Sequence, residues 1–127
     1  MRIYYISTMD FEITKFTDYT LVRVLAERLD INNAPDLKSE LVAVSADGEK
    51  YIVLDVKECN YCDSSGLSAI LVANRLCEEG LGTFILTGLQ RDVEQIIRIS
   101  MLHTVLVITR TVEEAVNILA EKDKQIS

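Results

Sequence analysis

Basic charge is scarce in this sequence, in which 13 Lys and Arg residues stand against 20 Asp and Glu residues, for a net charge of −7. This balance argues against binding to nucleic acid or to an anionic membrane surface, because both depend on clustered basic side chains. No apolar run approaches the ~20 residues of a membrane helix, and the first residues lack a signal-peptide pattern. We therefore expect no nucleic-acid partner, no membrane partner and a cytoplasmic location.

Ligands for a metal are also few, because the chain has three cysteines and one histidine. An odd number of cysteines cannot be fully paired in disulfides, and a closed zinc site would need more soft ligands. We expect no metal and no cofactor. The single C-x-x-C motif, Cys59 and Cys62, lies after a predicted strand and before a predicted helix, as in thioredoxin-like dithiols. No proline follows Pro35 to serve as the cis-proline of that fold, and Asp63 beside Cys62 opposes a thiolate.

Apolar and β-branched runs predict the strands. Hydrophobic residues make up 49% of the chain and charged residues 26%, which is typical of a globular domain. The runs lie at 11–16, 20–25, 51–56, 83–87 and 105–108. The first two are separated by three residues, which predicts an antiparallel hairpin. The last three are apolar on both faces, which is typical of parallel strands covered on both sides.

Residues at helical spacing predict four helices. The first begins near Pro35, the second is stopped by Gly80 and Gly82, and the fourth follows Thr111 as its N-cap. The third contains Val93, Ile96, Ile97 and Met101. The order is therefore β-β-α-β-α-β-α-β-α. It predicts one α/β domain over 1–127, with a mainly parallel sheet of about five strands, an N-terminal antiparallel hairpin and about four helices.

The loops that follow parallel strands emerge at one edge of the sheet, so three of them should converge. The second of these loops ends in Asp63-Ser64-Ser65-Gly66 before an apolar helix. The simplest interpretation is that Ser64 or Ser65 caps that helix. An exposed serine at a helix N-terminus also tolerates a phosphate. Because no nearby His or Lys could activate the hydroxyl and G-x-S-x-G is absent, we expect no catalytic residues and no enzyme.

The run Asp63-Ser64-Ser65-Gly66-Leu67 after the strand at 51–56 resembles the signature of STAS domains, specifically of anti-sigma factor antagonists. The resemblance covers about residues 10–120 and leaves 1–9 outside. It departs from the family at Glu27 and Met101, where the family commonly has glycine. Three further segments carry it: Leu29-Asp30-x-x-Asn33-Ala34-Pro35, Leu86-Thr87-Gly88-Leu89 and Thr111-Val112-Glu113-Glu114-Ala115.

The resemblance implies an STAS-type fold and a phosphorylation switch. A partner serine kinase that is also the anti-sigma factor would phosphorylate Ser64 and so end its own binding to the chain, and a protein phosphatase would reverse this. The unphosphorylated chain would bind that partner and release a sigma factor. The expected partner-binding residues are Asp30, Asn33, Tyr61, Asp63, Ser65, Gly66 and Gly88, with Tyr61 as an aromatic anchor.

Two matters stay open from the residues alone. STAS-like domains also serve as scaffolds or accessory subunits of signalling or transport complexes, and such a subunit would need no phosphorylation at Ser64. Residues 1–9 contain Ile3-Tyr4-Tyr5-Ile6, which could add an edge strand or pair with another copy in a weak homodimer.

Overall fold

A six-stranded sheet forms the centre of the computed structural model, which describes the backbone of residues 2–126 and the side chains of residues 4–122. Strand β1 pairs antiparallel with β2, and β2 with β3, whereas the other neighbouring pairs are parallel. The predicted α/β fold with an N-terminal hairpin is confirmed, and β1 adds a strand at one edge. In spatial order the strands are β1 (Arg2–Ser7), β2 (Phe11–Phe16), β3 (Thr20–Val24), β5 (Tyr51–Asp55), β7 (Thr83–Thr87) and β8 (Val107–Thr109).

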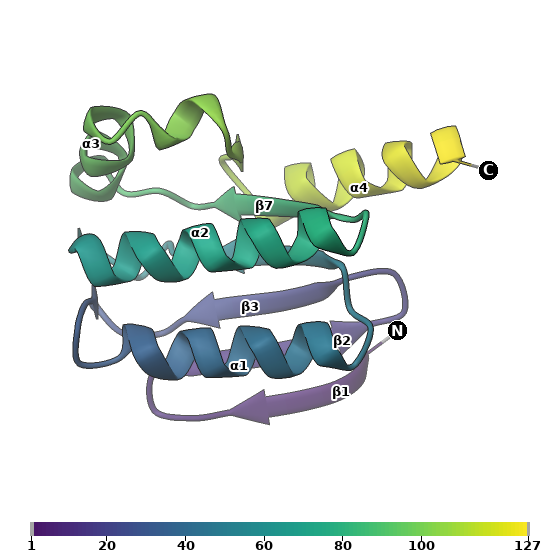
Figure 1. Cartoon of the computed structure of the whole chain (residues 1–127), viewed down its shortest axis with the longest axis horizontal. Coiled ribbons are helices and arrows are strands. Elements are labelled where there is room, and N and C mark those ends of the chain that lie inside the picture. The colour runs from purple at the N-terminus through teal and green to yellow at the C-terminus, as the bar shows by residue number, and fades with distance from the viewer. Residues whose placement is uncertain (1, 127) are drawn as a thin grey trace.

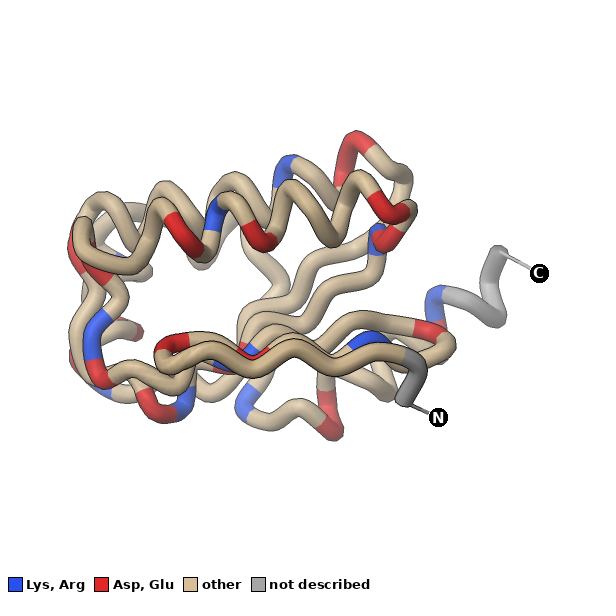
Figure 2. The backbone as a smooth tube through the Cα atoms, turned by 90° about the horizontal axis from the view of Figure 1, so that it is seen from below, with Lys and Arg blue, Asp and Glu red and all other residues tan. Residues whose placement is uncertain are grey.

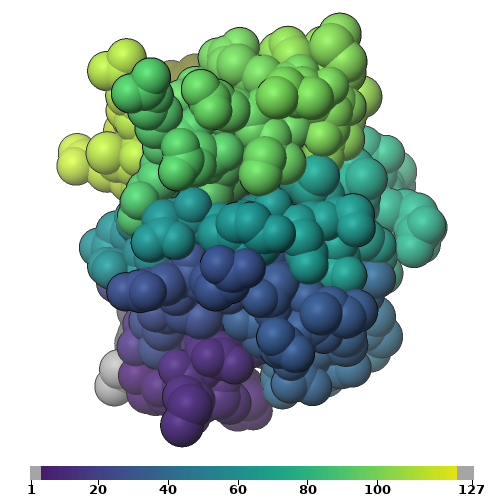
Figure 3. Space-filling model, turned by 90° about the vertical axis from the view of Figure 1, so that its left-hand side faces the viewer, coloured from purple at the N-terminus to yellow at the C-terminus, as the bar shows by residue number. Residues whose placement is uncertain are grey.

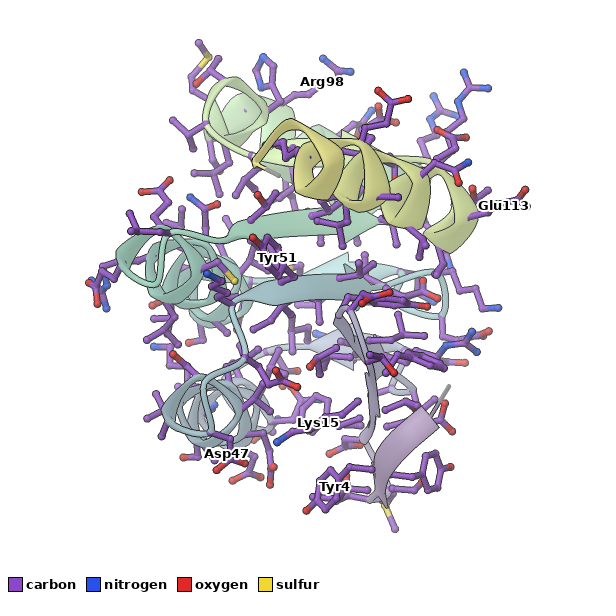
Figure 4. All side chains as sticks on the ribbon, turned by 90° about the vertical axis from the view of Figure 1, so that its right-hand side faces the viewer. Tyr4, Lys15, Asp47, Tyr51, Arg98 and Glu113 are labelled. Carbon is purple, nitrogen blue, oxygen red and sulfur yellow. The ribbon has the colours of Figure 1, made fainter. Side chains whose placement is uncertain are left out.

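Helices cover both faces of the sheet. On one face lie α1 (Ala34–Ala46) and α2 (Ser64–Glu79), and α4 (Val112–Ile126) lies on the other, as Figures 1 and 4 show. The central strand β5 therefore buries side chains on both sides: Ile52 and Leu54 join the larger core under α1 and α2, and Val53 joins the smaller core under α4. This arrangement confirms the two-sided burial expected from the apolar run at 51–56.

Shorter elements complete the chain. Helix α3 (Arg91–Ile99) follows β7, and the 3-10 helix η1 (Leu102–Thr104) follows α3. Two residues of β4 (Arg28–Leu29) pair in parallel with two residues of β6 (Tyr61–Cys62) in a separate small ladder. A two-residue strand carries no periodicity, so this ladder could not be predicted from local pattern.

The last strand begins two residues later than expected. We predicted a strand at 105–108, but β8 is Val107–Thr109, and Val105 is 58% exposed. The apolar run indicated a strand without fixing its start. Pairing with β7 fixes it, because Ile85 lies opposite Val107 and the residues just before 105 form the turn of η1.

The glycines after α2 act differently from the prediction. Gly80 has an ordinary φ of −81°, and the left-handed residue that ends the helix is Leu81, with φ of 62°. Its neighbour Gly82 donates its N–H to the Cys77 carbonyl at 2.8 Å. A side chain at Gly82 would collide with the backbone carbonyl of Lys50, so close approach rather than chain reversal requires this glycine.

Replacing the left-handed residues by glycine should stabilise the fold. Leu81 and Met101 both have φ of 62°, each follows a helix, and they are 84% and 60% exposed. A left-handed conformation costs an L-residue about 1–2 kcal/mol, and the entropy of a new glycine offsets part of the gain. We expect Leu81→Gly and Met101→Gly each to raise the free energy of unfolding by roughly 0.5–1 kcal/mol in urea titrations. The controls Leu81→Ala and Met101→Ala keep the strained Cβ, so a similar gain from them would contradict this account.

Candidate functional site

The loops that follow β3, β5 and β7 meet at the carboxyl ends of these strands and form one surface, here termed the loop face. Figure 3 looks onto it and shows its segments stacked in chain order, from purple and blue through teal to green. The convergence expected from a parallel sheet is therefore present. The contacts that join the first loop to the second differ from those that join the second loop to the third.

Asp63 connects the first two loops through both of its carboxylate oxygens. Oδ1 accepts the N–H of Gly66 at 3.0 Å, and Oδ2 accepts the N–H of Ile31 at 3.2 Å. The backbone N–H of Asp63 donates to the carbonyl of Leu29 at 3.2 Å. Asp63 is thus the N-cap of α2 and at the same time fixes the α2 N-terminus to the loop before α1.

Backbone pairing strengthens this connection. The β4 and β6 ladder places Arg28 beside Tyr61 and Leu29 beside Cys62. One step earlier, the N–H of Asn60 donates to the Glu27 carbonyl at 2.8 Å. The loops after β3 and β5 are therefore fixed to each other, and most of the bonds between them join main-chain atoms.

Ser64 lies at the first position of α2 with an exposed side chain, and Ser65 follows it half-buried. The prediction that one of these serines caps the helix is wrong, because Asp63 takes that role. A carboxylate has two acceptor oxygens and can bond the helix and the neighbouring loop together, which a serine hydroxyl at this place would not do. The Ser64 hydroxyl is therefore not needed for the cap.

Asp30 and Asn33 organise the loop before α1. The Asn33 side chain is 7% exposed, accepts the N–H of Asp30 at 2.9 Å and donates to the Arg28 carbonyl at 2.8 Å. The Asp30 carboxylate accepts the N–H of Asn32 at 3.0 Å and lies 3.3 Å from the Arg28 guanidinium. Asn33 thus positions the loop from inside, whereas Asp30 lies at its surface next to the Asp63 connection.

The loop face also carries large exposed side chains beside Asp30 and Asp63. The Arg28 guanidinium stacks on the Tyr61 ring at 3.8 Å from the ring centroid, and Tyr61 is 37% exposed. Ile31, whose backbone N–H binds Asp63, is 65% exposed. Tyr61 was predicted from the sequence to be a partner-binding residue, whereas Ile31 and Arg28 were not. A large aliphatic residue in a polar loop, Asp-Ile-Asn-Asn, is the signal that would have indicated Ile31.

The two glycines among the expected site residues have separate roles. A Cβ on Gly66 would lie 2.5 Å from the Cys62 sulfur and 2.5 Å from the Leu29 carbonyl oxygen, so the first turn of α2 packs directly on β4 and β6. Gly88, with φ of 79°, lies against Asp55 and Lys57 instead. The third loop therefore borders the start of the second loop, where the Gln90 amide also donates to the Lys57 carbonyl at 2.6 Å.

The two cysteines of the C-x-x-C motif are buried, with 0% and 2% of their surfaces exposed. Burial raises the pKa of the Cys59 thiol above its ordinary value, and burial with the nearby Cys59 and Asp63 raises the pKa of Cys62 to about 12. Dithiol chemistry needs an accessible thiolate. Both observations argue against the thioredoxin-like alternative.

The described residues offer neither a metal-binding cluster nor a membrane-spanning helix. Within residues 4–122 no three His, Cys, Asp or Glu side chains gather closely enough to hold a metal ion. Among the helices of the described backbone, none combines the length and the apolar composition needed to cross a membrane.

Comparison with protein families gives a match to the STAS domain over residues 10–115. BtrV of Bordetella bronchiseptica, which carries the description of an anti-sigma factor antagonist, is 28% identical over 98 residues. That alignment covers 77% of this chain and 84% of BtrV.

Solved structures share the fold. A Thermotoga maritima protein described as an anti-sigma factor antagonist superimposes with a TM-score of 0.78 at 22% identity, covering 87% of this chain and 94% of that one. The Bacillus cell fate determinant SpoIIAA in its phosphorylated form gives a TM-score of 0.68 at 21% identity, covering 86% and 98% of the two chains. At these sequence identities, the superpositions show that the fold is shared.

Proposed function

Because the chain belongs to the STAS domain family, we propose that it is an anti-sigma factor antagonist whose binding is controlled at Ser64. The unphosphorylated chain binds an anti-sigma factor that is also a serine kinase, and so releases a sigma factor. Phosphorylation of Ser64 ends this binding, and a protein phosphatase restores it. On this proposal the chain acts in the cytoplasm, by binding alone and without catalytic residues of its own.

The observation that carries the proposal is the setting of Ser64. Its hydroxyl is exposed at the first position of α2, and its main chain is held in place by the Asp63 cap and by the β4 and β6 ladder. A kinase can reach the hydroxyl without unfolding any element. The description of BtrV as an anti-sigma factor antagonist and the existence of a phosphorylated form of SpoIIAA support the same interpretation.

Electrostatics explains how one phosphate could switch the loop face. A phosphoryl group adds about −1.5 to −2 charges at pH 7. The N-terminus of α2 favours an anion by roughly 0.3–1 kcal/mol, and the neighbouring Asp63 carboxylate opposes it, so the fold itself should change little in stability. A partner surface that fits a neutral hydroxyl must instead desolvate or exclude a dianion. Asp30 and Ile31 lie in the loop that the Asp63 carboxylate bonds, Tyr61 lies three residues before Ser64, and these are the side chains proposed to contact that surface.

The test is direct phosphorylation. The purified chain is incubated with ATP and its cognate anti-sigma serine kinase, and its intact mass is measured. We expect the addition of one phosphate, located at Ser64 by fragmentation and absent from Ser64→Ala. A partner that binds tightly yet adds no phosphate would favour the alternative, a scaffold or accessory subunit without this switch.

A further inference from the structure

Strand β1 forms one edge of the six-stranded sheet and has a single neighbour, β2. In Figure 1 it lies beyond α1, and Figure 2 looks onto this edge and shows β1 as a nearly uncharged stretch leading from the N-terminus to the turn before β2. Thr8 donates its N–H to the Phe11 carbonyl at 2.8 Å. Because main-chain groups alternate along an antiparallel strand, the N–H of Ser7 points away from β2, toward the open side.

The β1 edge lacks the features that prevent strands from pairing with other chains. Natural edges are shortened, bulged, covered, or interrupted by charges and prolines. The opposite edge strand, β8, is three residues long and is followed directly by Arg110. In contrast, β1 has six residues, no proline and one charged residue, Arg2, and its bulge lies before Tyr4. The pairing from Tyr4 to Ser7 is regular.

Charge would keep copies of this chain apart elsewhere, but not here. The molecule carries a net charge of −7. Strands β1 and β2 together hold Arg2, Glu12 and Lys15 as their charged residues, and Lys15 is paired with Asp47 at 2.7 Å, so this region is close to neutral. Although the molecule as a whole is acidic, two identical chains can therefore meet at β1 and β2 without strong repulsion.

The side chains of β1 suit a contact with themselves. Tyr4 and Tyr5 are each 45% exposed and point to opposite faces of the sheet. Lys15 lies 5.1 Å from the centre of the Tyr4 ring, and the Tyr5 hydroxyl donates to Glu12 at 2.8 Å, so both rings are already oriented. In a two-fold pair centred on Tyr5, Tyr5 faces its copy and Tyr4 faces Ile6 of the other chain. Aromatic and β-branched side chains are favourable cross-strand neighbours.

We propose that the β1 edge is a homodimer interface, at which β1 of one copy pairs antiparallel with β1 of a second copy. The two sheets would then continue into one another about a two-fold axis perpendicular to the sheet. A second copy is the favoured occupant because an antiparallel pair of identical strands is self-complementary and satisfies both chains with the same contacts. A contact made by one short edge strand is small, so the dimer is weak.

The geometry leaves the loop face open. The two-fold axis reverses the strand direction, so the two loop faces lie at opposite ends of the joined sheet. Each copy can therefore engage its own partner, and dimerisation is independent of the function proposed for Ser64.

Sedimentation equilibrium of the purified chain from about 5 to 500 µM tests the proposal. We expect the mean mass to rise with concentration toward twice the monomer mass. Ser7→Pro removes the outward N–H while leaving the β1 to β2 bonds intact, and it should weaken the dimer at least about tenfold. Ser7→Ala keeps the N–H and should behave like the wild type.

A second substitution guards against a folding defect in Ser7→Pro. Tyr4→Glu places a charge on the edge opposite Lys15 of the same chain, so it should fold and should also weaken the dimer at least tenfold. Ile99→Glu adds the same charge at an 82% exposed residue at the end of α3, on the far side of the sheet from β1 (Figure 1), and should not. A wild-type chain that stays monomeric at 500 µM overturns the proposal, as does a dimer that folded Ser7→Pro and Tyr4→Glu leave unchanged.

Discussion

Ser64→Asp should fold like the wild-type chain and bind the anti-sigma partner about a hundredfold more weakly, a loss of roughly 3 kcal/mol. The cap of α2 is made by Asp63, so the substitution leaves the helix start intact. The added carboxylate stands beside Asp63, which bonds the loop that carries Asp30, on a surface where the partner must bury it. Isothermal titration calorimetry gives the affinity, and thermal unfolding by circular dichroism verifies the fold.

Three matched variants separate charge from structure. Ser64→Ala should resist phosphorylation and bind at wild-type affinity. Ser65→Ala should still accept phosphate at Ser64, and it should lose little stability because Asp63 rather than Ser65 caps the helix. Thr17→Asp adds the same charge in the turn between β2 and β3, at the opposite end of the sheet from the loop face, and should leave binding unchanged. If Ser64→Asp binds as tightly as the wild type, a switch based on charge at Ser64 is wrong.

Gly66→Ala should destabilise the fold by about 2–3 kcal/mol, in the range of overpacked cores. The new methyl group would lie 2.5 Å from both the Cys62 sulfur and the Leu29 carbonyl oxygen, and neither can move freely. Leu29 accepts the N–H of Asp63, and Cys62 is buried. Relief of the overlap must separate α2 from β4, which also displaces Asp63 and Ser64. Urea unfolding measures the first effect, and partner affinity measures the second.

Gly80→Ala is the matched control for this experiment. It makes the same change at a residue with an ordinary φ of −81°, where the new Cβ would lie 3.2 Å from the Lys50 Cβ, so that a shift of a few tenths of an ångström relieves the contact. Its effect should stay within about 0.5 kcal/mol. A double-mutant cycle with Cys62→Ala should recover part of the loss from Gly66→Ala, because it removes one of the two overlapping atoms. Equal losses from Gly66→Ala and Gly80→Ala would contradict the role of close packing.

The larger elements could be predicted because their periodicity is long. The continuous apolar run in 51–56 indicated a strand buried on both faces, and Pro35 indicated the start of α1, which has a proline in its first turn. Thr111 was expected to cap α4, and its hydroxyl accepts the N–H of Glu114 at 3.1 Å. In each case the cause is local, so neighbouring residues along the chain are enough to reveal it.

The details of the site could not be predicted in the same way. Asp63 binds Ile31 from 32 residues away, and such a contact leaves no periodic pattern in either segment. A serine next to an aspartate at a helix start offers two candidate caps, and the choice depends on which other donor lies within reach. The left-handed conformations at Leu81 and Met101 were missed because neither residue is a glycine, the usual residue in that conformation after a helix, and Met101 was instead expected inside the third helix.

The small ladder between β4 and β6 also bears on how such a protein can diverge after gene duplication. The bonds that hold Ser64 in place join main-chain atoms of Leu29 to Asp63 and of Glu27 to Asn60, and these bonds do not depend on which side chains the residues carry. Exposed side chains such as Ile31 and Tyr61 are therefore free to change without displacing the serine. Duplicated copies in one cell could keep the same position for the phosphate and yet recognise different kinases. Parallel signalling pathways would then remain separate.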